Sequence, residues 1–249
     1  MKTFKIFVLA ILLGCAGSAR ATVWNVGDLT TYASASWGGD PVGNPPFTDP
    51  DPGAVLLVAQ FNTVYGATFG VTVGSFSGFT MSFTDATSVL AYMPSIGPFA
   101  PLNGNVLNPI STVSGGFGGE TLGLEFNVDF SDAGLLPGTS GLRFGDLIIA
   151  NLNGAQAPLN GLTVRQFLGD MNILLSGGTS VITIADLGSL VGEVNGSFFE
   201  GTPEQFAQDH LVAPETSSET PLPAAFPLFA SGLGAFGLLG WRRKRKQAA

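Results

Sequence analysis

Positively charged residues are almost missing from the middle of this 249-residue chain. No lysine lies between Thr22 and Trp241, and the only cations of this span are Arg143 and Arg165. All 18 aspartates and glutamates fall in the same span, so its net charge is −16. Because such a surface repels phosphates and other anions, the composition excludes nucleic acid as a partner and disfavours acidic polymers and anionic lipids.

Cysteine and histidine occur once each, which argues against disulfides, zinc sites and a catalytic triad that needs histidine. Cys15 lies so close to the N-terminus that its removal with a leader would leave a chain without disulfides. His210 stands beside Asp209 without a nucleophile-elbow motif, and no second histidine or cysteine completes a zinc site. We therefore predict no catalytic residues and no cofactor. Asp49 and Asp51 are weak candidates for calcium, with a solvated turn as the alternative.

Residues 1–21 have the three parts of a secretory signal peptide. Two lysines begin the segment, an apolar core follows, and Ala19 and Ala21 flank the predicted signal peptidase site. An alternative is lipid attachment at Cys15, because residues 12–15 resemble a lipobox. Either interpretation predicts export through an inner membrane.

The pattern of residues 22–158 predicts a β-rich domain. Residues 54–59 form a continuous apolar run of strand length, and short alternating stretches follow around Val73 and Met81. The clearest alternation covers residues 122–130, where every second residue is Leu, Phe or Val. Another strand is expected within residues 142–149. We therefore predict a mainly β fold, an antiparallel β-sandwich-like domain with a helical C-terminal portion.

Helical spacing begins in the predicted helical subregion, residues 159–212. The strongest helix has Thr163 as its expected cap and ends before two glycines at 177 and 178. Two shorter helices are expected near residues 183–194 and 203–210. Residues 85–94 fit either a short helix capped by Asp85 or a strand.

Two residues in the predicted β-rich region, Arg143 and Trp37, have both a structural and a functional interpretation. Arg143 faces Asp129, Asp132 and Asp146 in sequence, which predicts a structural ion pair with one of these carboxylates. Its alternative is an anion-binding arginine. Trp37 is interpreted either as a core residue or as an aromatic that stacks on sugars.

The chain closes with three segments in a fixed order, after a linker at 213–219. Pro221, Leu222 and Pro223 form a stiff extended tripeptide. Residues 224–241 form an apolar run long enough for a single transmembrane helix. Five cations then stop transfer across the membrane, namely Arg242, Arg243, Lys244, Arg245 and Lys246.

Several sequence pieces within residues 220–249 carry a family resemblance: Pro221-Leu222-Pro223, Gly232-Leu233-Gly234, Leu238-Leu239-Gly240 and the run from Trp241 to Lys246. They resemble the PEP-CTERM sorting signal of Gram-negative bacteria in its Pro-Leu-Pro variant. Leu222 stands where the name-giving glutamate often lies, and Thr220 replaces a usual valine. The resemblance implies an exosortase that cleaves near the proline tripeptide, followed by transfer to the cell surface or the exopolysaccharide matrix.

These features together predict a secreted, exosortase-processed protein of the cell surface or biofilm matrix with a structural or adhesive role. Its expected partners are the exosortase, the inner membrane for a transient period, and a polysaccharide. The alternative is an extracellular glycoside hydrolase or another enzyme that acts on matrix polysaccharide, because any two of the 18 acids can converge in space. A lipoprotein anchored at Cys15 is a third hypothesis.

Overall fold

Helices, and not strands, make up most of the regular structure of this protein. The computed structural model describes residues 22–43, 49–187 and 189–215. It is about 44% helical and 9% strand. The predictions of a mainly β fold and of a β-sandwich are therefore wrong.

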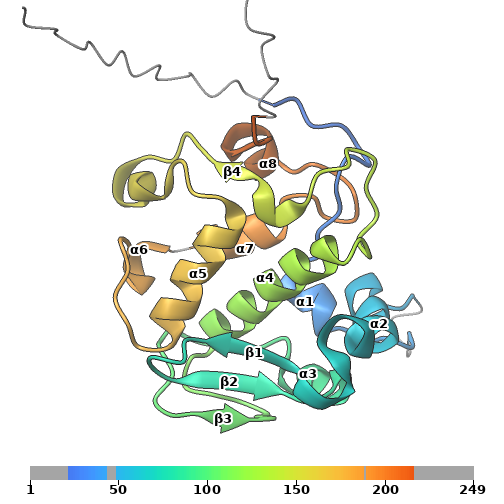
Figure 1. Ribbon diagram of the computed structural model, residues 1–249, viewed down its shortest axis with the longest axis vertical. Coiled ribbons are helices and arrows are strands. Elements are labelled where there is room, and N and C mark those ends of the chain that lie inside the picture. Colours follow the sequence, from blue (N-terminus) through green and yellow to red (C-terminus); the bar gives the residue numbers. More distant parts are fainter. Residues whose placement is uncertain (1–21, 44–48, 188, 216–249) are drawn as a thin grey trace, which may run out of the picture. The chain divides into compact units, whose positions relative to one another are not determined.

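The elements follow one another in an irregular order along the chain (Figure 1). The helices are α1 (Ser34–Trp37), α2 (Pro52–Phe69), α3 (Ala86–Tyr92), α4 (Gly116–Asp132), α5 (Val164–Leu175), α6 (Ile184–Leu187), α7 (Leu190–Asn195) and α8 (Gln205–His210). Two 3₁₀ turns are η1 (Phe144–Asp146) and η2 (Gly154–Leu159). The strands are β1 (Val71–Gly74), β2 (Thr80–Phe83), β3 (Val106–Leu107), β4 (Ile148–Ile149) and β5 (Leu211–Val212).

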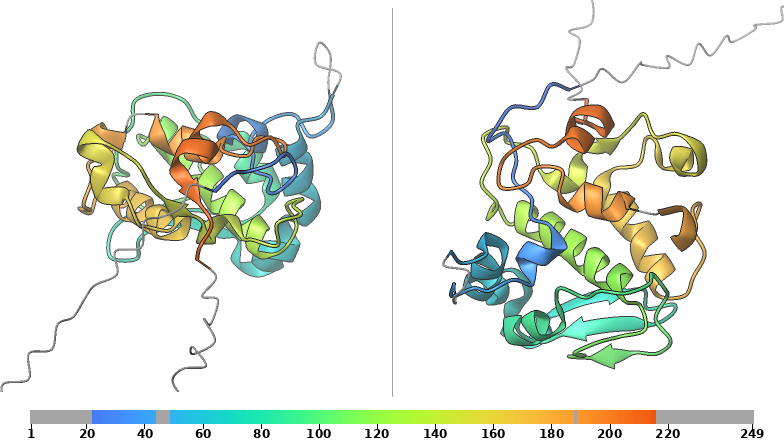
Figure 2. Two further views of the ribbon diagram at one scale, coloured as in Figure 1. Left: turned by 90° about the horizontal axis from the view of Figure 1, so that it is seen from above. Right: turned by 180° about the vertical axis from the view of Figure 1, so that it is seen from behind.

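Helix α4 lies at the centre of the fold. It contacts α1, α5, α7 and η1, and Figure 2 shows α7 beside it in the view from behind. The three-stranded sheet β1–β2–β3 lies at one end of α4, with α3 next to it (Figure 1). β1 and β2 pair antiparallel, while the two residues of β3 run parallel to β2.

The alternating stretch 122–130 is helical because α4 is buried on nearly all sides. The apolar residues at even positions are buried, and so are Gly123 and Asn127 between them. The helical period is carried instead by the partly exposed Glu120, Glu125 and Asp129. A helix that is buried on nearly all sides lacks the single apolar stripe of a surface helix. The alternation of residues 122–130 was therefore read as the pattern of a strand.

Two other predicted strands also differ from the structure. Residues 54–59 lie in α2, which begins with Pro52 at its first turn and buries Ala54, Leu57 and Phe61 at helical spacing. Within residues 142–149 only the two residues of β4 form a strand, after the turn η1.

The helix capped by Thr163 was predicted correctly, whereas residues 85–94 were left open between a helix and a strand. Asp85 accepts a hydrogen bond from the Ser88 amide at the start of α3, which settles that ambiguous stretch as a helix. Thr163 and Gln166 form a complete capping box at the start of α5. The strands at Val71–Gly74 and Thr80–Phe83 are also confirmed.

A buried polar network joins the N-terminal segment to α4 and α7. The Asn127 side chain accepts from the Tyr32 amide at 2.9 Å and donates to the Tyr32 carbonyl at 2.8 Å. It also accepts from the Trp37 indole at 3.3 Å and donates to Asn195 at 3.1 Å. Trp37 is fully buried, so it is a core residue and not a sugar-stacking aromatic.

One hydrophobic core cluster extends from Trp24 to Leu211 and includes residues on both sides of position 158. Among the described residues, no helix is long and apolar enough to cross a membrane. The predicted transmembrane segment 224–241 lies outside the described residues.

Candidate functional site

Arg165 of α5 binds two carboxylates, Asp132 at the end of α4 and Asp146 in η1. Its two terminal nitrogens donate to Asp132 at 2.7 and 2.9 Å in a bidentate pair, and one of them reaches Asp146 at 3.3 Å. The hydrogen bonds that Arg165 donates to Asp132 raise the pKa of Arg165 above its usual value. Arg165 therefore holds α5, α4 and η1 together through charge-assisted hydrogen bonds.

Arg143 has a looser position in the same cluster. Its nearest carboxylate oxygen belongs to Asp132 at 3.8 Å, and 58% of its side chain is exposed. Of the three predicted partners, Asp132 and Asp146 come together around Arg165, whereas Asp129 faces α2. The bidentate geometry expected of Arg143 is thus found at Arg165, the other arginine of this span.

Glu125 and Asp129 form a second carboxylate pair one turn apart on α4. Asn172 of α5 donates from Nδ2 to Glu125 Oε2 at 3.2 Å. The hydroxyl of Tyr65, from α2, is buried and faces Asp129, but it lies outside the geometry of a normal hydrogen bond to any described residue. Both carboxylates are partly buried.

Burial and mutual repulsion make this pair resist ionisation. Burial, together with the charge of Asp129, raises the pKa of Glu125 to about 7. Burial also raises the pKa of Asp129. The Tyr65 hydroxyl has a pKa well above its usual value because it is buried beside both carboxylates.

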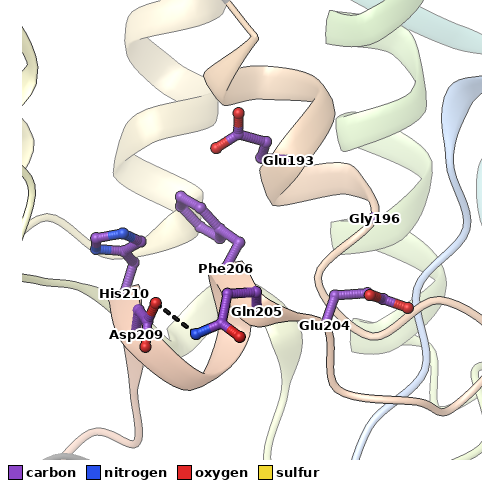
Figure 3. A pocket seen from close by; sticks show the side chains of 7 residues that line it. All are labelled: Glu193, Gly196, Glu204, Gln205, Phe206, Asp209 and His210. Atoms are coloured by element: carbon purple, nitrogen blue, oxygen red, sulfur yellow. Dashed lines mark hydrogen bonds between the residues drawn. The ribbon is translucent and has the colours of Figure 1, made fainter.

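A pocket of about 360 Å³ lies between α7 and α8 (Figure 3). It is lined by Glu193, Gly196, Glu204, Gln205, Phe206, Asp209 and His210. Glu193 of α7, Glu204 directly before α8 and Asp209 of α8 thus line one cavity. Gln205 donates to Asp209 at 2.7 Å, as the dashed line shows (Figure 3).

His210 also lines this pocket. Its Nδ1 lies 3.0 Å from the Ala150 carbonyl, which only accepts, so Nδ1 carries the proton and Nε2 accepts in the neutral ring. The ring packs on Phe206 with centroids 5.0 Å apart. The pocket lining is therefore rich in acceptors and suits ligands that donate hydrogen bonds.

The remaining predicted site residues are placed as follows. Asp51 accepts a hydrogen bond from the Asp40 amide at 2.8 Å, and Asp49 is exposed. No cluster of three or more His, Cys, Asp or Glu suited to a metal ion occurs within the described ranges. Ala19, Ala21, the tripeptide 221–223 and the basic residues 242–246 lie outside the described residues.

Sequence reasoning missed the pair on α4 and the pocket. The four-residue spacing of Glu125 and Asp129 was a usable signal, since it places two acids on one helical face. The strand interpretation of residues 122–130 concealed it. The pocket had no sequence signal, because its lining residues come together only when α7 packs against α8.

In comparisons with known proteins, no family model, no curated protein and no solved structure matches the chain.

Proposed function

We propose that this protein is exported by its N-terminal signal, held transiently at the inner membrane, and cleaved by an exosortase. The released domain acts at the cell surface or in the exopolysaccharide matrix in a structural or adhesive role. The observation that carries the proposal is the order of the C-terminal segments: proline tripeptide 221–223, apolar run 224–241 and basic cluster 242–246. This order resembles the PEP-CTERM signal.

Two features of the described domain support the proposal. Its last strand, β5, ends at Val212, directly before the predicted linker 213–219. Its charge is strongly negative because it lacks lysine, which keeps a released domain soluble and repels anionic surfaces. A domain of this charge favours neutral or amine-bearing glycans as ligands over acidic ones.

The test compares strains with and without the exosortase. In the strain with the enzyme, we expect the protein in the medium and at the cell surface, without residues 242–246. In the strain without it, the uncleaved chain accumulates in the membrane fraction. Identical distribution in both strains would contradict exosortase processing.

A second candidate function is hydrolysis of a matrix polysaccharide. The observation in its favour is that Glu193, Glu204 and Asp209 line one pocket, since glycosidases use two carboxylates that flank the scissile bond. All three are solvent-exposed, unlike the shielded carboxyl that a general acid requires, so this function ranks second. Release of reducing ends from a neutral glycan, abolished by Glu193→Gln or Glu204→Gln, would establish it.

A further inference from the structure

The tripeptide Leu-Asn-Gly occurs three times in this chain, at residues 102–104, 152–154 and 159–161, and Val-Asn-Gly occurs once, at 194–196. An asparagine followed by glycine is prone to attack by the glycine amide nitrogen on the asparagine side-chain carbon, because glycine has no Cβ to hinder the approach. Three of the tripeptides are identical, so a large difference in their reactivity must come from the fold.

The fold holds both reacting groups of Asn160 in place. Its Oδ1 accepts from the Leu152 amide at 2.8 Å, and its Nδ2 donates to the Leu152 carbonyl at 2.9 Å. The attacking group would be the Gly161 amide, which donates to the Ile149 carbonyl at 2.8 Å. Three hydrogen bonds must therefore open before Gly161 can reach the Asn160 side chain.

Asn195 is held in the same way inside the core. Its Nδ2 donates to Glu120 Oε2 at 2.8 Å, and its Oδ1 accepts from Asn127 at 3.1 Å. The Gly196 amide donates to the Gly192 carbonyl at 2.9 Å. Asn195 is also fully buried, so water does not reach it.

Asn153 is restrained less strongly. Its side chain is exposed and gives only a long hydrogen bond of 3.4 Å to the Asn151 carbonyl. Its backbone precedes η2, and its carbonyl accepts from the Gln156 amide at 3.3 Å. Rotation of this backbone toward the attacking geometry would therefore move the start of η2.

Asn103 has neither restraint. It is exposed, and neither its side chain nor the Gly104 amide makes a hydrogen bond to a described residue. The space around Gly104 is open, since a Cβ there would meet nothing within 4 Å. Of the three identical tripeptides, only this one leaves both reacting groups free.

We propose that Asn103 is a site of spontaneous deamidation. The Gly104 nitrogen forms a bond to Cγ of Asn103, which closes a succinimide ring, and the side-chain nitrogen leaves as ammonia with the proton that Gly104 gives up. Water then opens the ring at one of its two carbonyls. Opening at the side-chain carbonyl gives aspartate, and opening at the backbone carbonyl gives isoaspartate.

The modification changes the edge of the three-stranded sheet. It adds a negative charge, and isoaspartate also adds one atom to the backbone between two anchored residues. Leu102 donates from its amide to the Leu175 carbonyl at 2.8 Å, and Asn105 accepts from the Thr80 amide at 2.9 Å. This change beside β3 does not depend on how the C-terminal segment is processed.

The test follows each Asn-Gly pair in the folded full chain during incubation at mildly alkaline pH in water labelled with heavy oxygen. Digestion with pepsin in acid and mass spectrometry then locate the asparagines that have gained a labelled oxygen. Asn103 should convert first and Asn153 more slowly. Asn160 should convert on the order of a hundredfold more slowly than Asn103, because three hydrogen bonds must open first.

Two controls separate the fold from the local sequence. In urea, the three Leu-Asn-Gly tripeptides should convert at similar rates. Gly104→Ala keeps Asn103 and meets open space, so the folded variant should lose most of the conversion at this residue.

Three results would overturn the proposal. The first is equal conversion of Asn103 and Asn160 in the folded chain, and the second is a difference between them that persists undiminished in urea. The third is a Gly104→Ala variant that converts as fast as the native sequence, because attack by the Gly104 nitrogen would then be wrong.

Discussion

At the scale of single residues, two arginines with similar sequence surroundings have different structural roles. Arg165 makes a bidentate pair with Asp132 and a further contact with Asp146. Arg143 is more exposed and lies 3.8 Å from Asp132. Sequence proximity pointed to Arg143, because three acids lie near it in the chain, whereas the fold brings two of them, Asp132 and Asp146, to Arg165 on α5.

We expect Arg165→Ala to lower the free energy of unfolding by about 1–2 kcal/mol, since a bidentate network is worth more than an isolated surface pair. Arg143→Ala is the matched control, with an expected loss within about 0.5 kcal/mol. Urea unfolding at low and high salt measures both. Equal losses for the two variants would contradict the assigned roles.

Asn127 is the residue on which the buried polar network depends. Asn127→Ala leaves the backbone groups of Tyr32 and the Trp37 indole without their partner, so we expect a loss of about 3 kcal/mol. Asn153→Ala, at an exposed position, should change stability by less than about 0.5 kcal/mol. Thermal unfolding followed by Trp fluorescence compares them, and a near-neutral Asn127→Ala would show that the network is dispensable.

At the scale of elements, the sequence predicts the amphipathic helix α5, leaves α3 open between helix and strand, and fails for α2 and α4. Thr163 and Asp85 mark the starts of α5 and α3, because each side chain accepts a hydrogen bond from a backbone amide in the first turn of its helix. Helix α4 has no such signal, because Gly115 precedes it and has no side chain that could cap the helix. The glycines within α4 also let neighbouring segments approach closely. Its burial is a property of the fold and not of its own residues.

The glycines of α4 and α5 give opposite predictions. A Cβ on Gly118 would lie 2.3 Å from both Ser114 Oγ and Tyr92 Oη, so Gly118→Ala should destabilise the protein by about 1–3 kcal/mol. A Cβ on Gly169 meets nothing within 4 Å, so Gly169→Ala should stabilise by about 0.5–1 kcal/mol through helix propensity. Chemical denaturation measures both, and a stabilising Gly118→Ala would contradict the close packing of α4.

At the scale of the whole molecule, an acidic α-helical domain is followed by a segment that resembles a sorting signal. The fold of the domain was predictable in its helical second half and at β1 and β2, but not in its class. The carboxylate pair and the pocket were not predictable, because they arise where α4 meets α2 and α5, and where α7 meets α8.

The described domain should fold without the C-terminal segments. The contacts of the described residues group up to Ala213 in one unit, and the hydrophobic core ends at Leu211. We expect residues 22–213, expressed alone, to unfold cooperatively with a denaturation midpoint equal to that of the secreted form. Failure of this fragment to fold would show that residues beyond 213 belong to the domain.

The central claim is that the C-terminal segment is removed during delivery to the surface. Intact-mass measurement of the protein recovered from the medium and cell surface tests it most directly, because one spectrum defines both ends of the chain. The account predicts a species that begins near Thr22 and ends near Pro221–Pro223. Recovery of a chain that still carries Arg242–Lys246 would contradict it.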